Sequence, residues 1–299
     1  MNEGSASPGS RLPGTSLVGP PRTLVASAIR QRVATALVLA PLAVLGVLTL
    51  PTVYLALALA LVVLIAAAEW AVLAGISSAG GRLAYIALVG GCIALMWLPA
   101  RGWYIYFLAI ASLCWVGITI FLLRVQRIGL AQGVDLSLIP LGILVLLGPW
   151  VAIVRLHALG PQGPLLVLFL LALIWTVDSL AFVAGRRWGR TKLAPLLSPG
   201  KTRIGVYAGL FGAATCGFVL GWTMGLEARQ LAVVVVLCGV TACVSVAGDL
   251  FESLLKRRRA LKDSGRLLPG HGGVLDRIDS LTAAAPVFVM GILWMEAHL

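Results

Sequence analysis

Long apolar stretches with almost no charge are the feature that most constrains the fold of this 299-residue chain. Nine stretches approach the length of about 20 residues that a helix needs to cross the hydrocarbon core of a bilayer. They are continuous rather than alternating, which favours helices over the strands of a membrane barrel. Only Pro51 and Thr52 separate the first two, so the number falls to eight if these form a hairpin. The sequence predicts an all-α polytopic integral membrane protein with helices at roughly 33–50, 53–74, 83–99, 103–123, 136–155, 164–185, 205–226, 230–250 and 280–298.

The composition excludes an ordinary soluble domain. Only 11% of the residues are charged, against about 25% in soluble proteins, and the mean hydropathy is +1.01. We therefore interpret the formal net charge of +12 in terms of membrane topology and expect no nucleic-acid partner. The five cysteines lie inside apolar stretches without a C-x-x-C pair, as expected for small buried residues rather than a disulfide or zinc framework.

The basic residues divide unequally between the two sides of the membrane. If residue 1 starts in the cytoplasm and all nine stretches cross, only Arg101, Arg155 and Arg229 of the 23 basic residues fall outside. Basic residues concentrate on the cytoplasmic side of membrane proteins, so we expect a multi-pass protein of the cell inner (cytoplasmic) membrane with a cytoplasmic N-terminus. Residues 1–28, rich in Ser, Gly and Pro, are expected to form a disordered cytoplasmic tail, and residues 29–299 the transmembrane domain.

A run of small residues marks the seventh apolar stretch. Because they recur every four residues, they would lie on one face of a helix and let a neighbouring backbone approach closely. We interpret this face as a helix-packing surface formed by Gly205, Gly209, Ala213, Gly217, Gly221 and Gly225.

The segment SPGKT, residues 198–202, ends like a phosphate-binding loop but lacks the rest of that motif. Gly200, Lys201 and Thr202 match the end of G-x-x-x-x-G-K-[ST], whereas Pro195 stands where the first glycine belongs. An apolar stretch typical of a membrane helix precedes the segment, rather than a β-strand pattern. A nucleotide-binding P-loop is therefore disfavoured, and the polarity of this segment needs another explanation.

Two predicted cytoplasmic loops, residues 186–204 and 251–279, hold most of the functional polarity. Topology explains their basic residues but not the acidic ones, which are costly at membrane depth and usually mark function. The structural alternative is ion pairing with the many arginines. Around the start of the second loop, four polar residues are spaced to share one helical face: Asp249, Glu252, Ser253 and Lys256.

Asp276 and Asp279 add two carboxylates just before the last apolar stretch, and Asp178 lies inside an earlier one. Carboxylates without histidine or cysteine partners favour a hard cation, Mg²⁺ before zinc, and neighbouring basic side chains favour a phosphorylated anion. Together they indicate metal-assisted phosphoryl or nucleotidyl transfer. In PGHGG, residues 269–273, backbone N–H groups and His271 are expected to approach phosphate oxygens, with a structural loop histidine as the alternative.

These residues resemble the signature of CDP-diacylglycerol synthases, also called phosphatidate cytidylyltransferases. Its fixed positions are filled over 27 residues, and SPGKT, GDLFES at 248–253, Asp178 and EWAVLAG at 69–75 extend the resemblance from about residue 30 to the C-terminus. The matching positions are Ser253, Lys256, Arg257, Lys262, Asp263, Pro269, His271, Gly272, Gly273, Asp276, Arg277 and Asp279.

The resemblance implies transfer of the cytidylyl group of CTP to phosphatidate at the surface of the lipid bilayer, and it leaves a homodimer open. It implies that Asp249 and Asp276 hold Mg²⁺, with a second cation as an option, and that Asp279 and Lys256 complete the catalytic set. The substrate-binding residues that it implies are Ser198, Lys201, Thr202, Ser253, Arg257, Lys262, Asp263, His271, Gly272, Gly273 and Arg277.

Two positions depart from the family pattern, and several other functions stay open. Ile204 replaces the usual acid or amide after SPGKT, and Phe182 stands where tyrosine is common. The alternatives are a relative that uses another lipid phosphate, a lipid kinase with CTP as phosphoryl donor, an anion transporter and a non-catalytic scaffold. A transporter would place its charges near the midplane in two related halves, and no such repeat is evident in the sequence.

The basic asymmetry predicts which side of the membrane each loop faces. In a cysteine-less background, single cysteines at positions 191 and 264 should react with impermeant thiol reagents only from the cytoplasmic side, and one at position 228 only from outside. Labelling in inside-out and right-side-out vesicles checks this, and outside labelling of both predicted cytoplasmic loops would overturn the topology.

Overall fold

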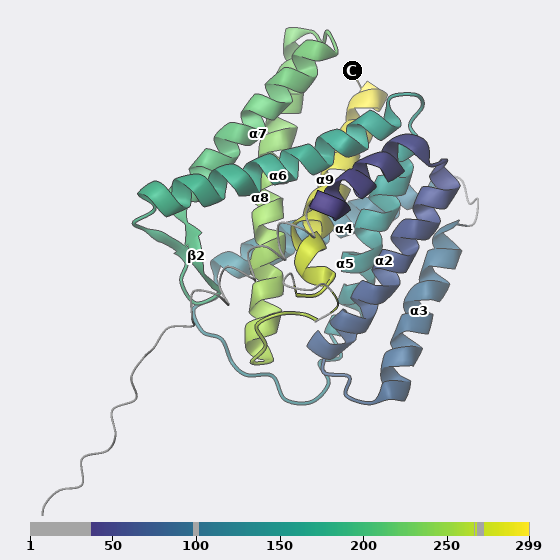
Figure 1. Ribbon diagram of the computed structural model, residues 1–299, viewed down its shortest axis with the longest axis vertical. Coiled ribbons are helices and arrows are strands. Elements are labelled where there is room, and N and C mark those ends of the chain that lie inside the picture. Colours follow the sequence, from purple (N-terminus) through teal and green to yellow (C-terminus); the bar gives the residue numbers. More distant parts are fainter. Residues whose placement is uncertain (1–36, 98–101, 266, 268–271, 299) are drawn as a thin grey trace, which may run out of the picture.

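The computed structural model describes residues 37–97, 102–265, 267 and 272–298, and most of them are helical (Figure 1). The first described helix is Leu37–Thr49. The elements that follow are α2 (Thr52–Leu73), α3 (Ala79–Trp97), α4 (Trp103–Leu123), α5 (Leu138–His157), α6 (Gly163–Trp188), β1 (Lys192–Ala194), β2 (Ser198–Thr202), α7 (Arg203–Thr223), α8 (Ala228–Arg258) and α9 (Leu275–His298).

Eight helices within these described ranges are long and apolar enough to cross a membrane, which confirms the predicted all-α polytopic architecture. The described part of the first apolar stretch, Leu37–Thr49, is shorter. Pro51 separates it from α2, and His157 fastens this junction because its ring lies 2.9 Å from both Thr52 Oγ1 and Val47 O. Of the two predicted numbers of membrane helices, nine and eight, the described residues therefore fit eight. The predicted tail, 1–28, lies outside them.

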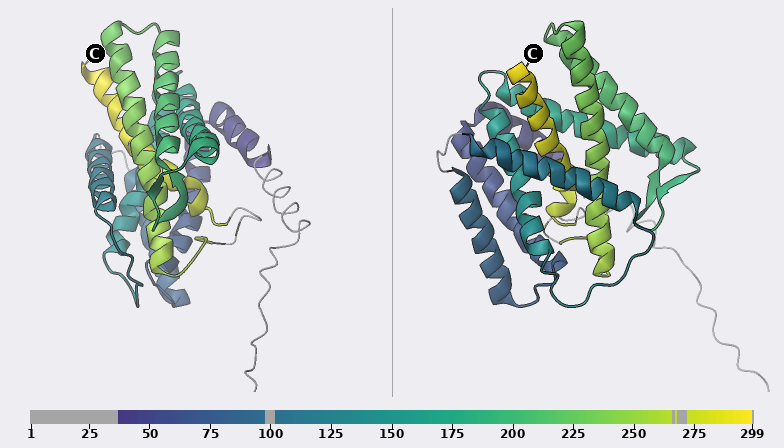
Figure 2. Two further views of the ribbon diagram at one scale, coloured as in Figure 1. Left: turned by 90° about the vertical axis from the view of Figure 1, so that its left-hand side faces the viewer. Right: turned by 180° about the vertical axis from the view of Figure 1, so that it is seen from behind.

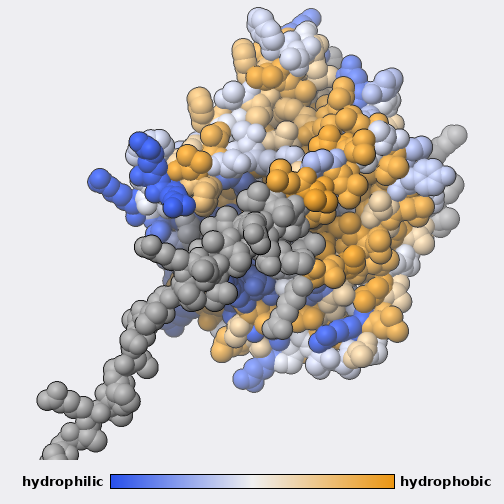
Figure 3. Space-filling view, in the orientation of Figure 1, coloured by the Kyte–Doolittle hydropathy of each residue, from blue (hydrophilic) through white to orange (hydrophobic). Residues whose placement is uncertain are grey.

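A broad apolar surface covers much of the face of the bundle seen in Figure 3. Many large hydrophobic side chains are exposed, and Leu123, Phe211 and Trp222 each expose more than 70% of their surface. In water this surface would be strongly unfavourable, whereas against lipid tails it carries no such cost. The protein is therefore a multi-pass membrane protein.

Aromatic packing at the centre of the bundle brings together helices from both halves of the chain. Phe251 of α8 lies 6.4 Å from Trp70 of α2 and 5.8 Å from Trp115 of α4, measured between ring centroids. The indole of Trp70 donates a hydrogen bond to Leu138 O at the start of α5 over 2.8 Å. These contacts fix the C-terminal half of α8 beside α2 and α4, close to the polar residues described below.

The small-residue face of α7 packs between α6 and α8 as predicted, except that Gly225 lies beyond the end of the helix and is exposed. A Cβ atom added at Gly209 would meet the side chain and backbone oxygen of Val177 on α6 at 3.0 and 3.2 Å. At Gly217 it would lie 2.9 Å from the Cα of Val235 on α8. Glycine at these positions lets three helices approach almost backbone to backbone.

A short β-hairpin, absent from our sequence predictions, occupies part of the loop between α6 and α7. β1 and β2 pair antiparallel, with Lys192 opposite Thr202 and Ala194 opposite Ser198. Thr202 then ends β2 and caps α7, since its Oγ1 accepts a hydrogen bond from Gly205 N over 3.2 Å. The SPGKT segment is thus a strand that leads into a helix rather than a loop around a phosphate.

Most helix connections lie at two opposite ends of the molecule, whereas the hairpin between α6 and α7 lies at its left-hand side in Figure 1 (Figures 1 and 2). The α2–α3, α4–α5 and α8–α9 connections lie at the lower end of Figure 1, and the α5–α6 and α7–α8 connections lie at the upper end with the C-terminus. Arg259 joins the lower connections, because its guanidinium donates to Leu73 O and Gly133 O over 2.8 Å each. For the five connections named here, the two ends follow one another along the chain in the order that the predicted topology requires. Which end faces the cytoplasm stays a prediction.

The close approach of α8 and α9 generates a stability prediction with a control on the same helix. A Cβ at Gly248 would lie 2.5 Å from Asp279 O, whereas one at Gly239 would meet nothing within 4 Å. Gly248→Ala should therefore destabilise the protein by about 1–3 kcal/mol through overpacking. Gly239→Ala should be neutral or stabilise it by up to about 1 kcal/mol through helix propensity. Thermal unfolding of the detergent-solubilised variants measures both, and equal behaviour would contradict the packing argument.

Candidate active site

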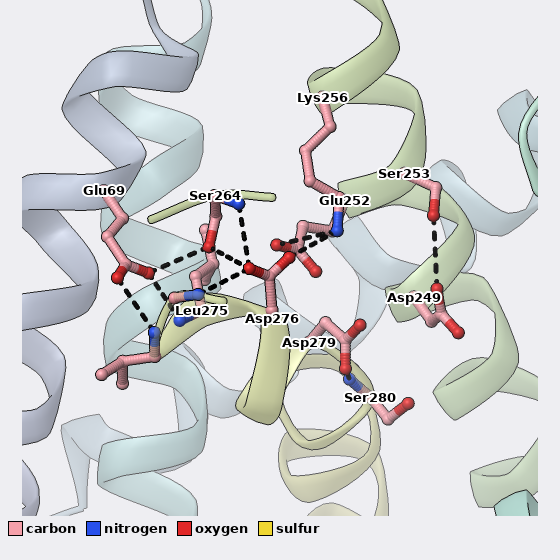
Figure 4. A network of polar contacts seen from close by, with 12 residues as sticks. Glu69, Asp249, Glu252, Ser253, Lys256, Ser264, Leu275, Asp276, Asp279 and Ser280 are labelled. Atoms are coloured by element: carbon pink, nitrogen blue, oxygen red, sulfur yellow. Dashed lines mark hydrogen bonds and ion pairs between the residues drawn. The ribbon is translucent and has the colours of Figure 1, made fainter. Parts of the chain in front are cut away.

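The last turns of α8 present a polar face to the start of α9 (Figure 4). The helix continues to Arg258, beyond the predicted end of its apolar stretch at residue 250, so the spacing of three and four residues is preserved. Ser253 Oγ donates to Asp249 Oδ1 over 3.3 Å, and Lys256 Nζ lies 3.5 Å from Glu252 Oε1. The predicted alignment of these residues on one face is present in the structure.

Asp276, in the first turn of α9, faces this surface and has a different set of partners on each oxygen. Its Oδ1 lies 2.6 Å from Lys256 Nζ. Its Oδ2 accepts hydrogen bonds from Ser264 N over 2.9 Å and from Gly273 N over 2.8 Å. The carboxylate is thus held by the α8–α9 connection on one side and by a lysine of α8 on the other.

Lys201 brings the SPGKT strand to the same face of α8. Its Nζ lies 2.6 Å from Asp249 Oδ2, and both side chains are partly exposed. The two polar stretches that the sequence placed about 50 residues apart therefore meet in space, each contributing one member of an ion pair. The ion pairs Lys201–Asp249 and Lys256–Asp276 link α8 to β2 and to α9, respectively.

Glu252 lies between these links and is nearly inaccessible, with 3% of its surface exposed. Neither of its carboxylate oxygens has a hydrogen-bond partner among the described residues. Asp279 lies nearby on α9 and accepts a hydrogen bond from Ser280 N over 2.6 Å (Figure 4). A buried carboxylate without a hydrogen bond is costly unless a positive charge compensates for it.

The cluster contains more negative than positive charge. Four carboxylates, from Asp249, Glu252, Asp276 and Asp279, face two lysines along the α8–α9 junction. Oxygen donors of this kind suit a hard cation, and the lysines suit an anion such as phosphate. The arrangement can therefore bind a phosphorylated compound together with a divalent ion at the edge of an apolar bundle.

Comparison with known proteins identifies the family. Residues 30–294 match the model of the cytidylyltransferase family. The chain belongs to this family. It is 39% identical to the phosphatidate cytidylyltransferase of Pseudomonas aeruginosa over 270 residues, which cover 89% of this chain and 97% of the relative. The phosphatidate cytidylyltransferase of Haemophilus influenzae is 34% identical over 283 residues, with 87% and 97% covered. The resemblance inferred from the signature is thereby confirmed.

The other signature residues of this family member lie around the cluster in varied settings. Arg257, Lys262, Asp263 and Arg277 are exposed, and Ser198 is partly exposed at the start of β2. Thr202 is only 4% exposed and is engaged as the cap of α7, so its side chain has a structural role here. His271 lies outside the described residues.

Gly272 and Gly273 support Asp276 through their small size. Gly272 has a φ of +83°, a left-handed conformation that favours glycine, and a Cβ there would lie 2.6 Å from Asp276 Oδ2. A Cβ at Gly273 would lie 2.3 Å from Ser264 Oγ. In this cytidylyltransferase the two glycines let the connection wrap closely around the carboxylate.

Sequence reasoning missed Ser264 altogether and left Glu252 and Glu69 without a role. Ser264 is 5% exposed, and its Oγ lies 3.0 Å from Asp276 Oδ2. A cysteine at position 264 would be shielded from thiol reagents, so the choice of that position for labelling is wrong. Position 191 is exposed, and a cysteine there still tests whether its loop faces the cytoplasm. No local sequence signal marks Ser264, because its partners lie on other elements.

Proposed function

We propose that the protein transfers the cytidylyl group of CTP to phosphatidate, producing CDP-diacylglycerol and pyrophosphate for phospholipid synthesis. The observation that carries this proposal is the joining of two distant polar segments by the ion pairs Lys201–Asp249 and Lys256–Asp276 at one end of an apolar bundle. A water-soluble nucleotide and a membrane lipid can meet only at such a boundary. The names of the relatives, which cover almost their whole length, support the same activity.

The proposed reaction is an in-line displacement at phosphorus. A phosphate oxygen of phosphatidate attacks the α-phosphorus of CTP, a new phosphoanhydride bond forms, and the bond to the β-phosphate oxygen breaks to release pyrophosphate. The attacking oxygen is already anionic, so no strong general base is needed. The residues of the site therefore act by binding, orienting and balancing charge.

The residues present fit a bound Mg²⁺. The carboxyl oxygens of Glu252 are buried without hydrogen-bond partners, and Glu252 shares Lys256 with Asp276, so the four carboxylates of the cluster have only two lysines to balance them. Among the described residues no three His, Cys, Asp or Glu side chains form a complete ligand set. Mg²⁺ usually takes only one or two carboxylates together with waters and substrate phosphates, and we assign these positions to Asp249 and Asp276. The ion would neutralise charge on the triphosphate when bound.

The two lysines are proposed to exchange partners when substrate binds. Without substrate, Lys201 and Lys256 neutralise Asp249 and Asp276. A triphosphate with its cation carries charges of both signs. The lysines can therefore turn to the phosphate oxygens while the cation balances the carboxylates. Lys256, beside the α9 carboxylate, is assigned to the reacting phosphates, and Lys201, on the hairpin, to the outer part of CTP.

Labelled CTP separates the proposed activity from a CTP-dependent lipid kinase. Purified protein is incubated with phosphatidate and CTP labelled either at the α- or at the γ-phosphate, with and without Mg²⁺. Cytidylyl transfer carries the α-label into lipid and leaves the γ-label in pyrophosphate, whereas a kinase would carry the γ-label into lipid. The inner-membrane location, the cytoplasmic N-terminus, the homodimer and a second cation stay predictions.

The carboxylates of the metal site generate the first kinetic prediction. Asp249→Asn or Asp276→Asn should keep the protein folded and lower kcat at least ~100-fold, the scale of a catalytic electrostatic contact. Asp135→Asn is the matched control, because Asp135 lies at the same end of the bundle and pairs with Arg258 over 3.3 Å outside the cluster. Its activity should stay near that of the wild type.

Two outcomes would contradict the metal assignment. One is normal turnover and unchanged Mg²⁺ dependence in folded Asp276→Asn. The other is full activity of the wild type in excess chelator.

The lysines generate a second prediction, on how activity is lost. Lys256→Ala should mainly lower kcat, because it removes contacts that strengthen in the transition state. Lys201→Ala should mainly raise the KM for CTP, because it removes contacts made equally in the bound and transition states. Lys192→Ala, in the partner strand of the same hairpin and exposed, is the control. Wild-type kinetics in folded Lys256→Ala would remove that residue from the site.

A further inference from the structure

Glu69 of α2 is a buried carboxylate that reaches the beginning of α9, about 200 residues later in the chain (Figure 4). Only 8% of its surface is exposed. Val274 N donates to its Oε1 over 2.9 Å, and Leu275 N donates to its Oε2 over 2.7 Å. N–H groups at the start of a helix have no partner within the helix, and a carboxylate there also interacts favourably with the helix dipole.

Ser264 connects Glu69 with Asp276. Its Oγ lies 3.0 Å from Glu69 Oε2 and 3.0 Å from Asp276 Oδ2, so the hydroxyl lies between the two carboxylates. The backbone N–H of Ser264 donates to the same oxygen of Asp276. One oxygen of Asp276 is thus fixed by the loop, and the other remains directed at Lys256.

The connection between α8 and α9 is shaped around the Glu69 side chain. A Cβ atom at Gly265 would lie 2.3 Å from Glu69 Oε1, and one at Gly273 would lie 2.4 Å from Glu69 Oε2. Real Cβ atoms do not approach that closely, so both positions require glycine while the carboxylate is in place. Two separate parts of the connection therefore lie against the Glu69 carboxylate, in addition to the start of α9.

We propose that Glu69 is a positioning residue for the cytidylyl transfer site. It holds Ser264 and the first turn of α9 against α2, and through them it orients the Asp276 carboxylate toward Lys256. It touches neither substrate in this role. The inference rests on the proposed function, because it assigns Asp276 to the reacting phosphates.

Replacing Glu69 with Gln changes the charge and one acceptor at nearly constant size. In either orientation of the amide, its NH₂ group would face the N–H of Val274 or of Leu275, and that backbone donor would lose its partner. Folded Glu69→Gln should therefore lose about 10- to 100-fold in kcat, the scale found for outer residues that orient metal ligands. The KM for CTP should change little, since Lys201 is untouched.

Glu227→Gln is the matched control. Glu227 also accepts a backbone N–H at a helix start, that of Gln230 in the capping box of α8, and it lies in the α7–α8 connection, away from the α8–α9 junction. It should keep wild-type kcat. A comparable loss of kcat in both variants would assign the effect of Glu69 to helix capping in general and overturn the positioning role.

A double-mutant cycle with Ser264→Ala distinguishes positioning from a mere loss of folded protein. If Glu69 acts through Ser264, the double variant should lose much less activity than the product of the two single losses. If Glu69→Gln only reduces the folded fraction, the two losses should multiply. Multiplicative losses, or a wild-type kcat in Glu69→Gln, would overturn the proposal.

Gly265→Ala gives the same test if Glu69→Gln does not accumulate, because the added methyl group displaces the carboxylate without removing it. It should lower kcat in the same range, and wild-type kcat would overturn the proposal. Wild-type protein is assayed in parallel. An inactive wild type contradicts the proposed function, whereas an active wild type with an unaffected Glu69→Gln variant contradicts only the role of Glu69.

Discussion

Charges at the edge of the hydrocarbon region must be balanced within the protein, and the junction of α8 and α9 depends on that constraint. Lys256 lies within reach of Asp276 and Glu252, and Lys201 reaches Asp249 from a separate strand. Each of these contacts requires a particular placement of backbone. The hairpin must fold back from the end of α6 to carry Lys201, and α8 must remain helical to Arg258 to carry Lys256. The shape of this end of the bundle follows from where its charges have to meet.

Small residues make these placements possible. Lipid tails are as apolar as leucine, so helices in a membrane associate through close packing rather than through the hydrophobic effect. Gly217 allows α7 to contact the backbone of α8, and Gly248 allows α8 to contact the backbone of α9 directly beside Asp279. The same device that holds the apolar part of the bundle together therefore also sets the distance between the carboxylate-bearing helices.

The sequence predicted the helices well because every crossing of the bilayer needs a continuous apolar stretch of about 20 residues. The face that holds Asp249 and Lys256 was predictable because helical spacing alone defines it. The end of α8 was placed too early, because its last two turns are charged and fall outside an apolar stretch. The hairpin was missed, since strands of three and five residues show no clear alternation. The partners of Glu69 lie about 200 residues away, a distance at which spacing carries no information.

The tie between α2 and α9 also has a consequence for synthesis in the cell. Glu69 leaves the ribosome long before Leu275, so a growing chain that has inserted its early helices carries this acid without the backbone donors that later satisfy it. Lys256 is likewise synthesised before Asp276, the carboxylate that pairs with it. The last helix thus supplies the backbone donors for Glu69 and the carboxylate for Lys256 that the earlier helices lack. A chain that stops before α9 would retain Glu69 and Lys256 without these partners.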